Sequence, residues 1–210
     1  MGVLLTGDLA SRLSMYYELL ERWNRKINLT SLDNPDEAID RLLLEPVVAA
    51  RAVGSSPILE LMDIGSGGGS PALPLAMALG SQVRLTLVEV KARKSAFLRE
   101  AVRHLELHTA VVENSRYEEI LGKPDRLEHF DALSVRAVRI EPRILMTLQA
   151  FLRPGGQMLL FRGPSGATEP ANIIHPLEFD STVPLMESLQ SRLSILRKRT
   201  SGAGVPRGTV

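Results

Sequence analysis

The chain has 210 residues, of which 44% are hydrophobic and 23% are charged, close to the norm for a globular protein. This balance excludes a disordered or fibrous chain, and the length fits one sizeable core with an appendage. Cys is absent and only four His are present, so disulfides, thiolate nucleophiles and zinc–thiolate sites are excluded and no metal site is expected. No apolar run approaches the roughly 20 residues of a membrane span and the N-terminus lacks a signal-peptide pattern, so we expect a cytoplasmic protein.

Charge is segregated along the chain, although the net charge is only +1. The first 60 residues hold 6 basic and 9 acidic side chains, whereas residues 91–103 hold 5 basic and 1 acidic. Arg outnumbers Lys 20 to 5, which favours bidentate contacts with phosphate or guanine over point-charge contacts. We therefore expect weak attraction of the whole molecule to nucleic acid and a local basic surface instead.

Residues 1–56 are predicted to form a helical N-terminal extension. Apolar residues recur every three or four positions from Leu9 to Ile27, which places them on one face of an amphipathic helix. Asn34 precedes a Pro and two acidic residues, the pattern of a helix N-cap. We expect Pro46 to end or kink this second helix.

Residues 57–200 alternate short β-rich runs with helical periodicity, which predicts a mostly parallel sheet with crossover helices. Strands are expected over residues 58–64, 83–89, 109–113, 130–135 and 157–162, and helices over residues 71–79, 92–105, 117–121 and 141–152. We expect a tight turn at 154–156 and a closing antiparallel hairpin from 177–184 and 192–199. The resulting fold is α/β with a seven-stranded sheet, and residues 201–210 are expected to be a disordered tail.

The strongest local signal is a glycine-rich turn, DIGSGGG at residues 63–69, placed between a predicted strand and a predicted helix. Glycines there let the backbone turn sharply and approach a ligand closely, as in nucleotide-binding βα turns. Twenty residues after Gly69, Glu89 ends the next predicted strand, where a carboxylate can accept both hydroxyls of a ribose. Asp63 either contacts the cofactor or positions the turn through hydrogen bonds.

The glycine spacing distinguishes between two kinds of nucleotide-binding motif. The dinucleotide fingerprint requires a glycine where this chain has Ser70. The G-x-G-x-G spacing after Asp63 resembles motif I of the class I S-adenosylmethionine-dependent methyltransferases, which implies a Rossmann-like fold and a site for that cofactor.

A closer resemblance covers nearly the whole chain, from about residue 9 to residue 199. The matching segments are 23–30, 63–76, 87–98, 115–119, Arg136-Ala137, Pro154-Gly155-Gly156 and Gly163. They occur in the same order as in the bacterial small-subunit ribosomal RNA guanine-N7 methyltransferases, the RsmG or GidB family, which the chain resembles. The resemblance implies methyl transfer from S-adenosylmethionine to N7 of a guanine in 16S ribosomal RNA or the small subunit, with S-adenosylhomocysteine as product. We expect a monomer.

The resemblance and the glycine turn together define the expected site. The cofactor is expected to contact Asp63, Gly65, Ser66, Gly67, Gly69, Leu73, Glu89, Tyr117, Glu118 and Arg136. Guanine N7 is an unprotonated lone pair that needs no general base, so orientation of the reactants should dominate. Arg136 is the candidate to hold guanine O6, and Arg116 is the second choice or a phosphate partner. The basic run on the predicted helix 92–105 is either a solvated face or a phosphate contact.

Several departures from the family leave the acceptor open. Leu42, Glu45 and Pro46 stand near positions where the family usually carries a His and an Asp-Ser pair, Ala72 stands where it has Gly, and Arg162 where it has Lys. These changes cluster where substrate would sit. Another RNA, a protein or a small molecule therefore remains an alternative acceptor, and a nicotinamide-linked oxidoreductase or a non-catalytic RNA-binding protein remains an alternative class.

Overall fold

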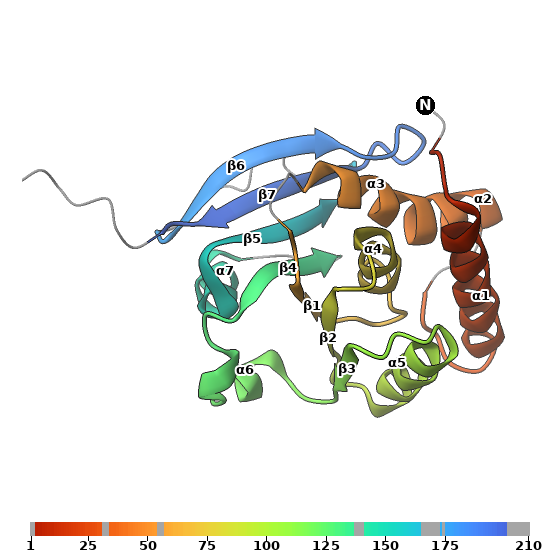
Figure 1. The fold of residues 1–210 in the computed structure, drawn as a ribbon, viewed down its shortest axis with the longest axis horizontal. Coiled ribbons are helices and arrows are strands. Elements are labelled where there is room, and N and C mark those ends of the chain that lie inside the picture. The colour runs from red at the N-terminus through yellow and green to blue at the C-terminus, as the bar shows by residue number, and fades with distance from the viewer. Residues whose placement is uncertain are drawn as a thin grey trace, which may run out of the picture.

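A computed structural model describes residues 3–30, 34–53, 57–136, 141–164, 173 and 175–200. It contains one seven-stranded sheet in the order β3-β2-β1-β4-β5-β7-β6, in which β7 is antiparallel to both of its neighbours (Figure 1). The strands are β1 (Glu60–Ile64), β2 (Arg84–Val88), β3 (Ala110–Glu113), β4 (Phe130–Arg136), β5 (Leu152–Arg162), β6 (Leu177–Pro184) and β7 (Arg192–Lys198). The predicted α/β fold and the closing hairpin are confirmed.

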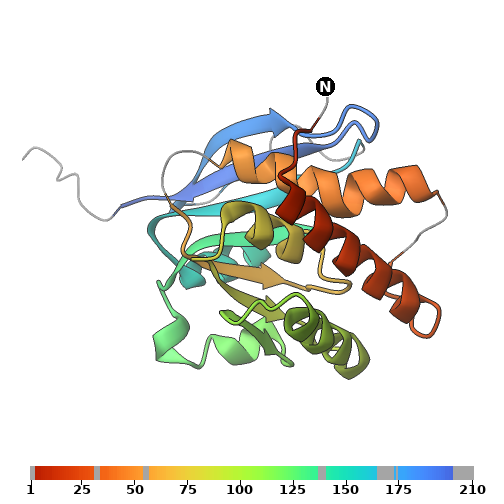
Figure 2. The same ribbon diagram turned by 45° about the vertical axis from the view of Figure 1, so that its right-hand side comes forward.

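Helices cover both faces of the sheet (Figures 1 and 2). They are α1 (Gly7–Asn24), α2 (Pro35–Ile39), η1 (Asp40–Leu44), α3 (Glu45–Ala52), α4 (Ala72–Leu79), α5 (Ala92–His104), α6 (Tyr117–Ile120) and α7 (Pro142–Leu148), with short 3-10 turns η2 (Pro124–Arg126) and η3 (Gln149–Phe151). None of the helices in the described part of the chain is long and apolar enough to cross a membrane.

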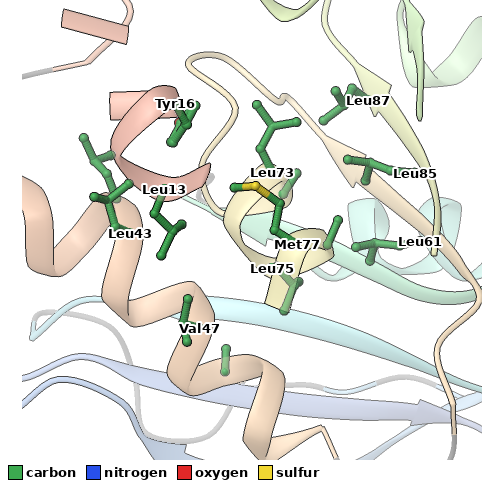
Figure 3. Close-up of a cluster of buried hydrophobic side chains, with 14 of the residues drawn as sticks. Leu13, Tyr16, Leu43, Val47, Leu61, Leu73, Leu75, Met77, Leu85 and Leu87 are labelled. Carbon is green, nitrogen blue, oxygen red and sulfur yellow. The ribbon is translucent and has the colours of Figure 1, made fainter. Parts of the chain in front are cut away.

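The alternation of side chains along each strand creates two cores, one on each face of the sheet. In β1, Leu61 belongs to the core beneath α1, α3, α4 and α5, whereas Met62 belongs to the core beneath α6 and α7. Figure 3 shows Leu73 of α4 between Tyr16 of α1 and the sheet. Helix α4 is thus covered on its outer side by the N-terminal helices, which explains why most of its residues are buried.

Helix α1 is tied directly to the turn after β1. Tyr16 is fully buried, and its hydroxyl donates a 2.6 Å hydrogen bond to the carbonyl of Gly68. Beyond Asn24 the helix ends, because the Asn24 side chain accepts from the amides of Leu29 and Thr30 and closes a loop. Ile27 therefore lies outside the helix, contrary to the prediction that the helical face extends to this residue.

The predicted turn at 154–156 is wrong. Residues 154–156 do not form a turn before β5 but lie inside that strand as a bulge, because the register jumps between the pairs Phe130–Leu152 and Ala132–Gln157. Gly156 lies so close to β4 that a Cβ would be 3.1 Å from the Phe130 carbonyl. Pro46 does not end the helical segment, which runs from Pro35 to Ala52 and changes from the π-helical turn η1 to α-helix at Glu45, one residue before Pro46. The predicted boundary at 54–56 and the predicted tail at 201–210 lie outside the described residues.

The hydrogen bond from the Tyr16 hydroxyl to the Gly68 carbonyl is expected to stabilise the folded protein. Tyr16→Phe keeps the buried ring but leaves a carbonyl without its donor, so the free energy of unfolding should fall by about 1 to 3 kcal/mol. Tyr17→Phe, on the same helix but only partly buried, is the matched control. Chemical denaturation of both variants would test this, and equal effects would contradict it.

Candidate functional site

The turn between β1 and α4 is held by hydrogen bonds from the neighbouring strand. The amides of Gly65 and Ser66 both donate to the carbonyl of Val88, at 2.9 and 3.0 Å. The amide of Gly67 donates to Oε2 of Glu89 at 2.9 Å, and Oε1 of the same carboxylate accepts from the amide of Lys91. Glu89 therefore joins the turn to the end of β2, where the sequence analysis places the ribose ligand.

Two glycines of this turn are required by the geometry. Gly69 has φ +87°, and a Cβ there would lie 2.6 Å from Cδ1 of Leu73. Gly65 has φ +74° and no atom within 4 Å of a hypothetical Cβ, so its exposed face is open to a ligand. Gly65 lines two pockets that lie on either side of the turn.

The first of these, which we call the apolar pocket, has a volume of about 200 Å³. Its lining consists of Ile64, Gly65, Val88, Glu89, Val90, Ser115, Tyr117, Val135, Ile144 and Leu148. The hydroxyl of Ser115 is buried and has no hydrogen-bond partner in the described structure. An aromatic heterocycle with a polar edge fits such a lining, because the aliphatic walls cover its faces and the hydroxyl is available to its nitrogen atoms.

The second, which we call the basic pocket, has a volume of about 380 Å³ and lies on the side of the N-terminal helices. Four cations, Arg41, Lys94, Arg136 and Arg162, and one acid, Glu45, are among its lining residues. The remaining lining comes from the glycine turn, from Leu20, Leu29, Thr30, Leu42 and Ser70, and from Phe161, Gly163, Leu189 and Ser191. The excess of cations makes this pocket suited to an anionic ligand.

Arg136 lines the basic pocket, and one nitrogen of its guanidinium, Nη1, is held by other residues. Its Nη1 is 2.5 Å from Oε2 of Glu45 and donates to the carbonyl of Arg41 at 3.0 Å. Its guanidinium carbon is 4.8 Å from the centre of the Phe161 ring, a cation–π distance. Burial lowers the pKa of the guanidinium, while Glu45 opposes that shift. Nε and Nη2 are buried and have no hydrogen-bond partner in the described structure.

The junction between the π-helical turn η1 and α3 supplies the groups that hold Arg136. The amide of Glu45 donates to the carbonyl of Asp40, five residues back, so the carbonyl of Arg41 is left free for the guanidinium. Pro46 has no amide hydrogen and leaves the Leu42 carbonyl free as well, which accepts from the Ser70 hydroxyl at 2.9 Å. The two unused carbonyls thus link η1 to β4 and to the glycine turn.

Asp63 lies beneath the turn and lines neither pocket. It is 1% exposed, and its carboxylate accepts a hydrogen bond from the Ser134 hydroxyl. Burial raises the pKa of Asp63 to about 6, although hydrogen bonds from Ser134 and Ser66 act in the opposite direction. The side chain therefore connects β1 to β4, and the geometry favours the positioning role among the two that the sequence left open.

The structure gathers most, but not all, of the predicted site residues. Gly65, Ser66, Gly67, Glu89, Tyr117 and Arg136 line one of the two pockets or both. Leu73 is fully buried against Gly69. Arg116 and Glu118 are exposed and line neither pocket. Two residues in these roles, Ser115 and Glu45, were not predicted from the sequence. Ser115 stands in a segment that resembles the family, and Glu45 stands where the chain departs from it.

Comparison with known proteins agrees with this architecture. The chain matches the GidB family, rRNA small subunit methyltransferase G, over residues 9–198. It is 36% identical over 204 residues to a ribosomal RNA small subunit methyltransferase G of Xanthomonas axonopodis pv. citri, covering 92% of this chain and 89% of that protein. It is 38% identical over 159 residues to the protein of the same name from Stenotrophomonas maltophilia strain R551-3, covering 76% and 71% of the two chains.

Solved structures show the same fold at low sequence identity. An O-methyltransferase from Bacillus cereus in complex with S-adenosylhomocysteine has a TM-score of 0.64 and 15% identity, covering 89% of this chain and 91% of its own. A SAM-dependent methyltransferase from Aquifex aeolicus has a TM-score of 0.60 and 13% identity, covering 85% and 97%.

The sheet order and the glycine turn beside two pockets define a class I methyltransferase, a class that uses S-adenosylmethionine. Within this class, the chain belongs to the rRNA small subunit methyltransferase G family. The resemblance found in the sequence is thereby confirmed, and so is the predicted cofactor.

The raised pKa of Asp63 predicts a pH-dependent effect of Asp63→Asn. Because the folded pKa of about 6 exceeds the ordinary 3.8, ionisation of Asp63 lowers stability as the pH rises from about 4 to about 6. The Asn variant avoids this loss, so its stability relative to the parent protein should increase over that range, by about 1 to 3 kcal/mol. Denaturation at pH 4, 5, 6 and 7.5 would test this, and a constant difference would contradict it.

The Glu45–Arg136 pair predicts a non-additive mutant cycle. Glu45→Ala leaves a buried guanidinium without its counterion and should lower the free energy of unfolding by roughly 3 to 5 kcal/mol. Adding Arg136→Met removes the unpaired charge while retaining a long side chain over Phe161, so the double variant should be more stable than Glu45→Ala alone. Denaturation of the two single variants and the double variant would measure the coupling; additive effects would show that the pair does not interact.

Proposed function

We propose that this chain transfers a methyl group from S-adenosylmethionine to N7 of a guanine in 16S ribosomal RNA, in the cytoplasm. The main support for an RNA substrate is the basic pocket beside the glycine turn, whose lining contains four cations and one carboxylate. A polyanion is the ligand that such a lining attracts. The relatives named as small-subunit ribosomal RNA methyltransferases support RNA as that polyanion.

The residues of the apolar pocket fit the adenosyl part of the cofactor. The unpartnered Ser115 hydroxyl suits a nitrogen of adenine, and Tyr117 and the aliphatic side chains suit the faces of the ring. Glu89, at the rim and already bonded to two amides, has further lone pairs for ribose hydroxyls. When bound, S-adenosylmethionine supplies an electrophilic methyl group. Gly65, common to both pockets, is the point where the adenosyl side meets the acceptor side.

The chain's own contribution to the chemistry is orientation. Guanine N7 carries a lone pair, so no residue has to remove a proton before attack. N7 and O6 are neighbouring acceptors, and a donor on O6 fixes the base while leaving N7 free. Arg136 lines the basic pocket and is the donor that we assign to this task, with Glu45 and the Arg41 carbonyl orienting its guanidinium from the Nη1 side. Phe161 adds an aromatic surface beside the guanidinium.

The departures near residues 42–46 do not remove the acceptor site. Glu45 still provides a carboxylate, which holds Arg136, and Pro46 frees a carbonyl that holds Ser70. Leu42 is an apolar lining residue where the family has a His. These roles support a guanine acceptor without a histidine in the pocket. The alternative that the acceptor is another RNA, a protein or a small molecule would be favoured if methyl transfer to such an acceptor were observed.

Incubation with labelled S-adenosylmethionine and small subunits lacking the modification, followed by chemical cleavage at N7-methylguanine, would test the proposal. Cleavage at one guanine is the expected result. Incorporation at another atom, or none despite demonstrated S-adenosylhomocysteine binding, would contradict the proposed acceptor. Titration with NAD would identify an oxidoreductase if NAD bound and S-adenosylhomocysteine did not.

Two substitutions should separate cofactor binding from turnover. Arg136→Lys keeps a charge beside Glu45 but loses the planar donor fork, so kcat should fall by about 100-fold or more with little change in the Kd for S-adenosylhomocysteine. Glu89→Ala removes the proposed ribose ligand and should raise that Kd by roughly 10-fold or more. Calorimetry and steady-state kinetics would measure both. Equal loss of cofactor affinity in the two variants would contradict the division of roles.

A further inference from the structure

A basic groove lies beside the basic pocket, between the end of α1 and the start of α5. It has a volume of about 420 Å³ and is lined by Lys26, Ile27, Asn28, Lys91, Ala92, Arg93 and Lys94. Figures 1 and 2 show that the end of α1 lies beside α5, and the two helices are in contact. Two segments far apart in the sequence thus bring four cations to one surface.

These cations are not explained by pairing within the protein. Among the described residues, no acidic side chain lies within salt-bridge distance of Lys26, Lys91, Arg93 or Lys94. Like charges crowded on an open surface repel one another and destabilise the folded chain. A cluster of this kind is stabilised when an external anion lies between its members.

The position of the cations on α5 also opposes helix stability. Arg93 and Lys94 occupy the first turn of α5, and Lys91 is its N-cap. The amide end of a helix carries partial positive charge, so acidic residues are favoured there and cations are not. The first turn of α5 contains no acidic residue. The same amide end that disfavours these side chains favours a phosphate, and their positive charges add to that attraction.

Lys94 makes the groove continuous with the basic pocket. It lines both of them, and a Cβ on Gly67 would lie 3.9 Å from its Nζ. Lys94 is also only partly exposed, in contrast to Lys26, Lys91 and Arg93, which are exposed. None of the residues that line the groove is acidic, so a chain of phosphates can cross it to the entrance of the basic pocket.

We propose that this groove binds the RNA backbone next to the target nucleotide, with Lys26, Lys91 and Arg93 on phosphates outside the pocket and Lys94 at its entrance. The proposal rests on the proposed function, since it names the surface by which that substrate reaches the site. The spacing of cations along an open groove fits a flexible single strand or a loop, whose phosphates can follow the surface. The groove carries affinity and position, and the basic pocket carries the reacting base.

The test compares two double variants with the same change in charge on the same two elements. Lys26→Glu/Arg93→Glu alters the groove, whereas Arg22→Glu/Arg99→Glu alters exposed cations of α1 and α5 that do not line it. Binding of 16S ribosomal RNA and the KM for methyl transfer are measured from 50 to 200 mM salt, and S-adenosylhomocysteine affinity and Tm are measured for each variant.

The groove variant is expected to bind RNA about 10-fold or more weakly, with the slope of log K against log salt reduced by about 1 to 2. Its S-adenosylhomocysteine affinity should be unchanged, and an acid at position 93 should not lower its Tm, so unfolding would not explain the loss. The control variant should show a small shift without the change in slope. Equal effects of the two double variants on RNA binding would overturn the groove proposal.

The binding readout separates this proposal from the proposed function. Groove-dependent RNA binding by a protein that transfers no methyl group would support the groove and contradict the proposed reaction. Methyl transfer with equal sensitivity of the two double variants would support the reaction and overturn the groove.

Discussion

One carbonyl, that of Val88, accepts hydrogen bonds from two consecutive amides and so fixes the chain reversal after β1. The first of those amides belongs to Gly65, the residue that lines both pockets. The neighbouring Glu89 carboxylate binds the next amide of the turn, and the Tyr16 hydroxyl binds the Gly68 carbonyl from above. A displacement of β2 against β1 would therefore move the turn that lines both pockets. The sheet register determines the geometry of the site.

A missing backbone donor helps to shape the basic pocket. Pro46 cannot donate to Leu42, and the π-helical turn before it removes the partner of the Arg41 carbonyl. Unsatisfied carbonyls are costly inside a protein, so each requires a donor from elsewhere. Arg136 and Ser70 provide those donors and are thereby placed beside the glycine turn. An irregularity in one helix thus orients a guanidinium that comes from a distant strand.

The sequence sufficed for the features that depend on local pattern. Alternating and continuous apolar runs located the strands, and the glycines located the turn after β1, because these signals lie within a few residues of their effect. The pair of Arg136 with residues of η1 was not predictable in this way, since the guanidinium and its Arg41 partner are 95 residues apart. The helical segment continues past Pro46, because the amide that Pro46 lacks is replaced by a donor from another element, the Ser70 hydroxyl on the Leu42 carbonyl. The bulge at 154–156 was missed because it is defined by the partner strand, β4.

The contact between Tyr16 and Gly68 also bears on modularity. A helix that only covered the sheet could be removed without changing the turn after β1. Here α1 shares one hydrophobic core with α4 and β1 and supplies a donor to the turn itself. Removing the N-terminal helices would expose α4 and leave that turn without its support. The α/β part of this chain therefore depends on α1 for its core and for the geometry of the turn.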